Sequence, residues 1–167
     1  MSEQTFLIRP LTPEDKALAL NFFDRMGPAT LRFFNRNNMH RDSLLACFAG
    51  KRPDKRNFIA VTVNDRGEEE IAGYVFLWDL HYKTPWLGIC VSENWQGHGL
   101  GGKLMAYAES YCRQLGKGGI FLTTDEENYA GQKLYTRSGY RQMGHFDGEL
   151  LYFRFFEDAY PVNDGTL

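Results

Sequence analysis

The most chemically suggestive stretch of the chain is WQGHGLGG, Trp95 to Gly102. Two glycine patterns overlap in it: Gly97-x-Gly99-x-x-Gly102, typical of dinucleotide-binding turns, and Gln96-x-x-Gly99-x-Gly101. Apolar residues then recur every three or four positions, which predicts a helix from Gly99 to Leu115. The first amides of a helix lack intrahelical partners and lie at the positive end of its dipole, so either pattern predicts a phosphate site. A flexible surface turn that only begins a helix is the alternative.

The composition limits the classes of protein to which the chain can belong. The chain has 167 residues, 43% hydrophobic and 15% aromatic, which predicts one domain over 1–167 with a substantial core. A net charge of −2 gives no global attraction to nucleic acid or to an anionic membrane. No apolar run reaches the roughly 20 residues of a membrane span, and the N-terminus lacks a signal-peptide pattern. Three widely spaced cysteines indicate neither a disulfide framework nor a metal site. We therefore expect a cytoplasmic protein without a metal.

The elements that must position this loop follow from the hydrophobic pattern. FLIRP predicts a first strand, and Thr12-Pro13-Glu14-Asp15 predicts a helix start, with the helix ending at Gly27-Pro28. A second helical region, Ala29 to Ala49, contains an expected break at Asn37-Asn38. The remaining predicted elements are strands FIAVTV, IAGYVFLWDL and WLGICV, the helix from Gly99, strand GIFLTT, a helix over Asn128 to Arg137, and a hairpin around Asp147-Gly148. The order β-αα-βββ-α-β-α-ββ is that of a mixed α/β domain of the α+β type.

The element order also discriminates between the two glycine patterns. In a dinucleotide fold the strand runs almost directly into the first glycine. Here five residues separate Val91 from Gly97, although Asp125 lies about where a ribose-binding acid is expected. The preceding strands have connections too short for crossover helices, and no second βαβ half follows. These features count against a nucleotide oxidoreductase.

The second pattern is part of a longer resemblance. The segment VSENWQGHGLGGKLMAYAESYC resembles motif A of the GNAT superfamily of acetyl-CoA-dependent N-acyltransferases, with Gln96, Gly99 and Gly101 at the pattern positions. About 30 residues later, NYAGQKLYTRSGY resembles motif B. Its matching residues are Asn128, Leu134, Tyr135, Gly139 and Tyr140, while Ala130 precedes Gly131, which holds the usual small-residue position. The resemblance covers nearly all of residues 5–156, and 158–167 is expected to be a loose tail.

The resemblance implies a fold, a cosubstrate and a set of site residues. The fold would be a mixed, mostly antiparallel sheet of about seven strands flanked by about four helices. The cosubstrate would be acetyl-CoA, with its pantetheine arm paired to the backbone of Ile89 and Val91 and hydrogen-bonded by Asn128. Its pyrophosphate would lie on the loop formed by Gln96, Gly97, His98, Gly99, Gly101, Gly102 and Lys103. Asn128 as a plain N-cap and His98 as a merely exposed residue are the simpler interpretations.

The reaction implied by the resemblance is direct attack of a neutral amine on the acetyl thioester. Tyr135 resembles the family's general acid, since a phenol is still protonated at neutral pH; simple packing of a helix face is the alternative. Many relatives carry a glutamate base on the central strand, but Trp86 occupies that position here. Asp79, His81 and Glu93 remain as base candidates, of which His81 has the most suitable intrinsic pKa. A water chain without a dedicated base also stays open.

The acceptor is indicated only by charge. Between Arg25 and Arg56 there are eight Lys/Arg and two acidic residues, a net charge of +6 in the segment that walls the acceptor site in this family. A positively charged entrance to the acceptor site favours an amine acceptor that also bears a negative group. The alternative is that these charges form only a solvated helix face. Two functions therefore stay open: an N-acetyltransferase, and a non-catalytic acyl-CoA-binding sensor on the same fold. A homodimer through the last strands is a further expectation.

Overall fold

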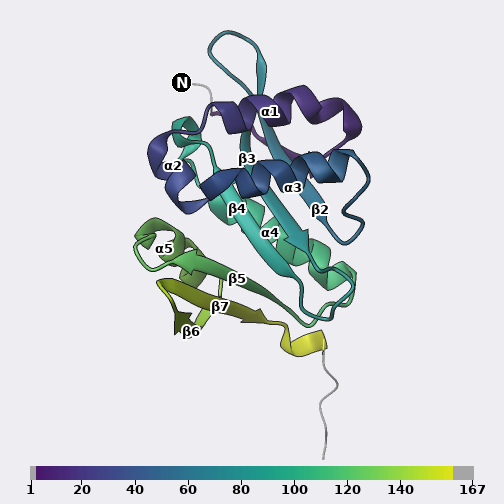
Figure 1. Ribbon diagram of the computed structural model, residues 1–167, viewed down its shortest axis with the longest axis vertical. Coiled ribbons are helices and arrows are strands. Elements are labelled where there is room, and N and C mark those ends of the chain that lie inside the picture. Colours follow the sequence, from purple (N-terminus) through teal and green to yellow (C-terminus); the bar gives the residue numbers. More distant parts are fainter. Residues whose placement is uncertain (1–2, 160–167) are drawn as a thin grey trace, which may run out of the picture.

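The computed structural model describes residues 3–159, which form one sheet with helices on both faces (Figure 1). The helices are α1 (Lys16–Asp24), α2 (Pro28–Phe33), α3 (Met39–Phe48), α4 (Leu100–Gln114) and α5 (Tyr129–Arg137). The strands are β1 (Leu7–Pro10), β2 (Arg56–Val63), β3 (Glu69–Trp78), β4 (Trp86–Val91), β5 (Gly119–Asp125), β6 (Arg141–Phe146) and β7 (Glu149–Phe155). The order predicted from the sequence is confirmed.

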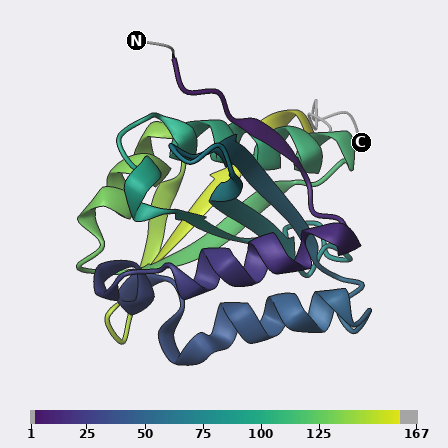
Figure 2. The same cartoon turned by 90° about the horizontal axis from the view of Figure 1, so that it is seen from above.

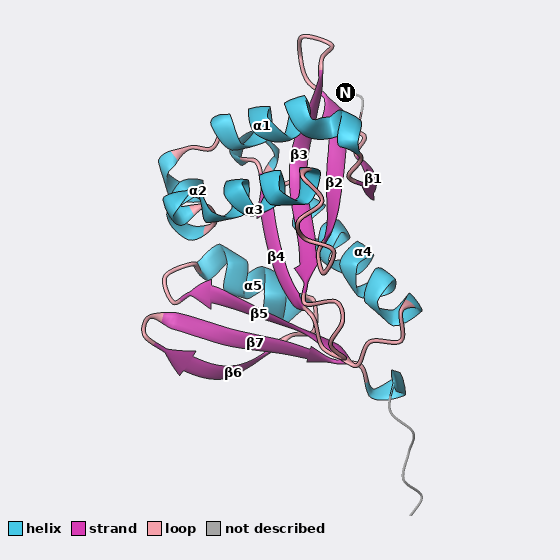
Figure 3. Cartoon of the chain, turned by 45° about the vertical axis from the view of Figure 1, so that its right-hand side comes forward, coloured by secondary structure: helices cyan, strands magenta, loops and turns pink. Residues whose placement is uncertain are grey.

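The seven strands lie in the order β1-β2-β3-β4-β5-β7-β6 (Figure 3). Every neighbouring pair is antiparallel except β4 and β5, which are parallel and joined by α4. The β2-β3-β4 meander and the final hairpin exclude a doubly wound dinucleotide fold. At the hairpin turn, Asp147 and Gly148 have φ of 52° and 78°, as a tight turn between twisted strands requires.

Alternation along β2 and β3 builds the core on both faces of the sheet. Phe58 and Val75 pack with α4 in one hydrophobic cluster, whereas Ile59 and Tyr74 pack with α1 and α3 in the other. Figure 2 shows α1 and α3 side by side on one face and α4 on the opposite face. Because both faces are covered, β3 is apolar along nearly its whole length, as the sequence indicated.

The second helical region divides into two helices at the expected break. Asn37 and Asn38, which lie between the end of α2 and the start of α3, both have φ of 57°, a left-handed conformation. The side chain of buried Asn35 accepts hydrogen bonds from the backbone N–H groups of His40 and Arg41 (3.1 and 3.2 Å). This division gives five helices where about four were expected, and it places α2 beside the open part of the sheet.

The C-terminal end of the described chain packs against the sheet. Asp158 lies in the expected tail but forms an ion pair with Arg113 of α4 (2.5 Å), and Ala159 contacts the core. The rest of the expected tail, 160–167, lies outside the described residues. Within the described residues, none of the helices has the length and apolar character needed to span a membrane.

Candidate functional site

The sheet opens between β4 and β5. These strands form one residue pair, Trp86 with Phe121, at the start of β4, supported by a hydrogen bond from the Phe121 N–H to the Pro85 carbonyl (3.0 Å). Beyond this pair the two strands diverge, as Figure 3 shows. The sheet is therefore open between β4 and β5 beyond this pair.

The edge of β4 that faces this opening carries backbone hydrogen-bonding groups. The Ser92 N–H donates to the Ala72 carbonyl on β3 (2.8 Å), and backbone groups alternate along a strand. Those of Ile89 and Val91 therefore point toward the opening. The Val91 carbonyl accepts a hydrogen bond from the Gln96 side chain (3.1 Å), which ties the following loop to the strand. An extended ligand can pair with this edge as an added strand would.

The glycine loop ends at the N-terminus of α4, beside the same opening. The first helical hydrogen bond runs from the Lys103 N–H to the Gly99 carbonyl (3.4 Å), so the amides before Lys103 have no partner within the helix. Gly97 and Gly99 have φ of 81° and 75°, a conformation that disfavours any side chain. The α4 helix is 15 residues long, so its positive end is well developed.

Gly101 and Gly102 differ in what the structure requires at each position. A Cβ at Gly101 would lie 3.1 Å from Leu134 of α5, so this glycine allows the two helices to approach. A Cβ at Gly102 would meet nothing within 4 Å. Neither the backbone nor the packing explains Gly102, and a glycine in a helix costs about 0.5–1 kcal/mol relative to alanine. Its absent side chain leaves room for a ligand on the helix end.

The loop before α4 is held by a polar network. The Trp95 indole donates to Glu70 on β3 (2.7 Å), and Arg25 binds the Ile71 carbonyl (3.1 Å) while lying 3.7 Å from the Glu70 carboxylate. The Trp95 ring packs edge-on against Phe6. The loop, α2, β4 and α5 together surround a cavity of about 800 Å³, a size that suits a cofactor.

Tyr135 lines this cavity from α5. It is 7% exposed, and Thr124 of β5 lines a second cavity together with it. Burial raises the pKa of Tyr135 to about 12, so the phenol keeps its proton throughout the physiological range. Asn128 accepts a hydrogen bond from the Gly131 N–H (3.1 Å) and donates to Thr124 (3.0 Å). Asn128 is thus the predicted N-cap of α5 and also ties this helix to β5.

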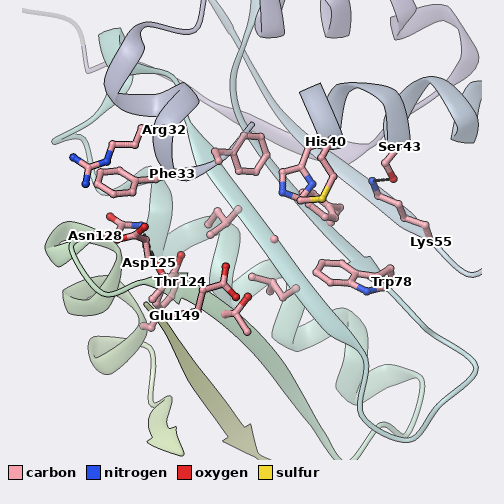
Figure 4. A pocket seen from close by; sticks show the side chains of 18 of the residues that line it. Arg32, Phe33, His40, Ser43, Lys55, Trp78, Thr124, Asp125, Asn128 and Glu149 are labelled. Carbon is pink, nitrogen blue, oxygen red and sulfur yellow. Dashed lines mark hydrogen bonds between the residues drawn. The ribbon is translucent and has the colours of Figure 1, made fainter. Parts of the chain in front are cut away.

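A second cavity, of about 550 Å³, lies on the α2/α3 side of the sheet (Figure 4). It shares Phe33, Phe34, Ile89, Asn128 and Tyr135 with the first cavity. The two cavities therefore meet where the sheet is open. Tyr135 and Ile89 are thus part of the lining of both cavities.

Several residues proposed from the sequence are not brought into these cavities. His98 packs near Phe6 and Trp95, and Lys103 is exposed; neither lines a cavity. His81 is exposed in the β3–β4 loop and contacts Tyr82, so the geometry does not support it as a base.

The other base candidates are placed as follows. Asp79 lines neither cavity, and its N–H donates to Asp54 (3.2 Å). Glu93 lines the first cavity, but its carboxylate accepts a hydrogen bond from Thr30 of α2 (2.8 Å). Trp86 stacks on Trp78 with ring centroids 6.2 Å apart, as an apolar strand residue.

Sequence reasoning missed the polar groups of the second cavity. His40 and Lys55 line the wall formed by α3 and the loop before β2, and Asp125 and Glu149 line the wall formed by β5 and β7. The charge count over 25–56 indicated a positive wall. The acidic wall had no signal of its own, because its residues come from two strand ends that are distant in sequence.

His40 predicts a loss of stability in weak acid. Its ring lies 4.7 Å from Phe34 and 5.0 Å from Phe76, and burial and the Lys55 charge lower the His40 pKa to about 4. Between pH 6.5 and 4 the unfolded chain binds a proton at this position that the folded chain does not. The free energy of unfolding should therefore fall by about 3 kcal/mol as pH drops through this window.

The matched test is urea denaturation of wild type and His40→Phe at pH 7, 5.5 and 4.5. The variant keeps the aromatic contacts but has no titrating group, so its stability should fall less over this range. Below pH 4 both proteins should lose stability alike, because the pKa values of Asp15 and Asp54 are held near 2 by Arg9 and Arg52. Equal slopes between pH 6.5 and 4 would contradict the role assigned to His40.

The comparisons with known proteins agree with this architecture. The model of the acetyltransferase (GNAT) family matches residues 21–140. The ribosomal-protein-S5-alanine acetyltransferase of Vibrio fischeri superposes with a TM-score of 0.75 at 14% identity, over 96% of this chain and 98% of that one. A domain from Methanocaldococcus jannaschii gives 0.74 at 18% identity, over 92% and 99%. Vibrio cholerae spermidine N-acetyltransferase, in complex with CoA and spermine, gives 0.67 at 16% identity, over 90% and 95%.

The family match spans well over half of the chain and includes both the glycine loop and α5. The chain belongs to the GNAT family of acetyltransferases. The structural neighbours are too distant in sequence to indicate more than the shared fold. The substrate must be argued from the residues of this chain.

Proposed function

We propose that this protein is an N-acetyltransferase that moves an acetyl group from acetyl-CoA to a primary amine of a small acceptor. The observation that carries this proposal is the meeting of two cavities at Tyr135 and Ile89, through the opening between β4 and β5. A protein that only binds acyl-CoA needs the first cavity but not the second. The passage between them supports transfer rather than storage of the acyl group.

In this proposal acetyl-CoA occupies the first cavity. Its pyrophosphate lies on the amides at the start of α4, where Gly97, Gly99 and Gly102 leave the backbone exposed. The pantetheine arm extends along the open edge of β4 and pairs with Ile89 and Val91. Asn128, which lines both cavities, is placed to bind the arm near its end. His98 and Lys103 stay peripheral contacts to the phosphates.

The chemical step is a direct transfer. The lone pair of the neutral amine attacks the thioester carbonyl carbon, the C–S bond breaks, and the amine nitrogen becomes an amide. The leaving thiolate takes a proton from the Tyr135 hydroxyl, and the proton lost from the amine passes to water or to a carboxylate of the second cavity. A phenol with a pKa of about 12 is fully protonated before the step and regains its proton from solvent afterwards.

The alternative, a non-catalytic acyl-CoA sensor, is favoured by one observation. Trp86 stands where many relatives carry a glutamate base, and its ring stacks on Trp78 and contacts Phe121 at a tilt. Asp125 and Glu149 line the second cavity and provide carboxylates there from different strands. The two functions differ in whether any amine is turned over.

The first test is a thermal-shift titration with acetyl-CoA, CoA and NADH in parallel. A ligand at 100 times its Kd adds about 2.7 kcal/mol to the free energy of unfolding. We expect acetyl-CoA and CoA to raise the midpoint clearly and NADH to leave it unchanged. Stabilisation by NADH alone would contradict the proposal. Stabilisation by CoA with no acetylation of any amine in a broad screen would favour the sensor.

The same proposal includes a homodimer through the C-terminal strands. β6 is an outer edge of the sheet, and Met143 and Phe146 are exposed on it at 63% and 85%. Exposed apolar side chains beside an unpaired strand edge are typical of surfaces that associate. The cavities themselves are lined from within one chain and do not need a partner.

A further inference from the structure

The second cavity contains a buried cation without a carboxylate partner. Lys55 is 4% exposed, its ammonium lies 3.0 Å from the Ser43 hydroxyl, and it lies 4.1 Å above the Phe76 ring. Burial lowers the pKa of Lys55 to about 8, so at neutral pH most molecules carry a protonated, positively charged Lys55. Over residues 3–159 no ion pair involves Lys55. A buried charge of this kind is costly unless a counter-charge arrives.

The other cations of this cavity already have acidic partners. Arg52 forms two hydrogen bonds with Asp54 (2.9 and 3.1 Å) and a third with Ser43. Arg32 contacts Glu127. Lys55 is therefore the cation of this wall that is positioned to bind an anionic group from outside. Ser43, which contacts both Lys55 and Arg52, can donate to the same group.

The opposite wall carries two carboxylates that face each other across strands. Asp125 and Glu149 are directly paired in the β5–β7 register, and both line the cavity. Figure 4 shows their side chains projecting into the cavity from the wall opposite His40 and Lys55. Like charges at directly opposite strand positions destabilise a sheet. Carboxylate oxygens on this wall can accept hydrogen bonds from a bound amine.

From this division of charge we propose that the acceptor is a small amino carboxylate, a molecule with a primary amine and a carboxylate. Its carboxylate binds Lys55 and Ser43 at one end of the cavity. Its amine lies toward Asp125 and Glu149, on the side where Tyr135 joins the two cavities. This inference rests on the proposed function and adds the substrate class. A diamine, which would put a second cation against Lys55, fits poorly.

The test compares amino acids with their matched amides. L-Amino acids and ω-amino acids, and the corresponding carboxamides, are titrated into the CoA-loaded protein by calorimetry. Each pair keeps the same carbon skeleton and amino group and replaces the carboxylate by an uncharged amide of similar size. We expect at least one amino acid to bind 10- to 100-fold more tightly than its amide, as a charge-assisted hydrogen bond predicts.

The variants separate binding from folding. Lys55→Met replaces a buried charge by an apolar chain of similar length, so the protein should remain folded and lose the preference for the carboxylate. Lys51→Met makes the same change at an exposed position outside the cavity, and this variant should still prefer the carboxylate over the amide. Glu149→Gln, at an exposed strand residue, should weaken the amino acid and its amide about equally.

The outcomes distinguish the two proposals. Preference for carboxylates that disappears only in Lys55→Met supports the inference, whether or not turnover is seen. Equal or tighter binding of amides or of 1,4-diaminobutane, or an unchanged preference in Lys55→Met, overturns it. Failure of every amino acid to bind overturns it as well. Failure of the proposed function appears separately, as absence of acetylated product from any amine with acetyl-CoA.

Discussion

Replacing Tyr135 by Phe is expected to lower kcat by about 100- to 10,000-fold, the usual contribution of a general acid. The affinity for acetyl-CoA should change by less than about threefold. The substitution removes the hydroxyl that protonates the leaving thiolate but keeps the ring that lines both cavities. Because the lost interaction is needed only in the transition state, kcat and kcat/KM should fall together. Steady-state kinetics with acetyl-CoA and the best acceptor gives both values.

Tyr140→Phe is the matched control. Tyr140 is a second buried tyrosine, with its ring centroid 6.5 Å from that of Tyr135, and it lines neither cavity. Its hydroxyl has no hydrogen-bond partner among the described residues, so its removal should cost little stability. We expect near wild-type kcat. Equal losses in the two variants, or wild-type kcat in Tyr135→Phe, would show that Tyr135 only packs the helix and that another group protonates the thiolate.

The part of the candidate site that is proposed to bind acetyl-CoA has local geometry, so the sequence alone indicates which of its residues lie together. Gln96, Gly99 and Gly101 lie within six consecutive residues, and the helix that follows fixes their orientation. Asn128 caps α5 and Tyr135 follows seven residues later, about two helical turns, so both lie on the same side of this short helix. The order of strands around these segments followed from apolar periodicity, because each element buries a face. Such features depend little on contacts between distant segments.

The second cavity, where the acceptor is proposed to bind, could not be predicted in the same way. Lys55 faces Glu149 only because β7 inserts between β5 and β6, so residues separated by about 90 positions share one cavity. His81 was favoured by its intrinsic pKa, but the β3–β4 loop ends beside α4, where Lys117 holds it by hydrogen bonds to the Leu80 and Tyr82 carbonyls. Intrinsic pKa describes the residue, whereas its place in a site depends on the sheet order.

Replacing Gly102 by Asp is expected to weaken binding of acetyl-CoA and CoA by at least 100-fold. The change puts a carboxylate on the helix end where the pyrophosphate is proposed to lie. Two like charges about 4 Å apart near a protein surface repel by about 4 kcal/mol, which corresponds to about 1,000-fold in Kd before screening. The free protein should be at least as stable as wild type, because a Cβ meets nothing within 4 Å and an acidic residue suits the first turn of a helix.

Gly102→Asn separates charge from size, since its side chain has nearly the same shape as that of Asp. We expect it to weaken CoA binding much less than Gly102→Asp does. Raising the salt concentration from 0.05 to 1 M should narrow the gap between the two variants, because ions screen the added charge. Calorimetric Kd values and melting midpoints at both salt concentrations provide the comparison. If Gly102→Asp binds CoA as wild type does while remaining folded, the pyrophosphate does not lie on this helix end, and the glycines from 97 to 102 serve only to turn the chain into α4.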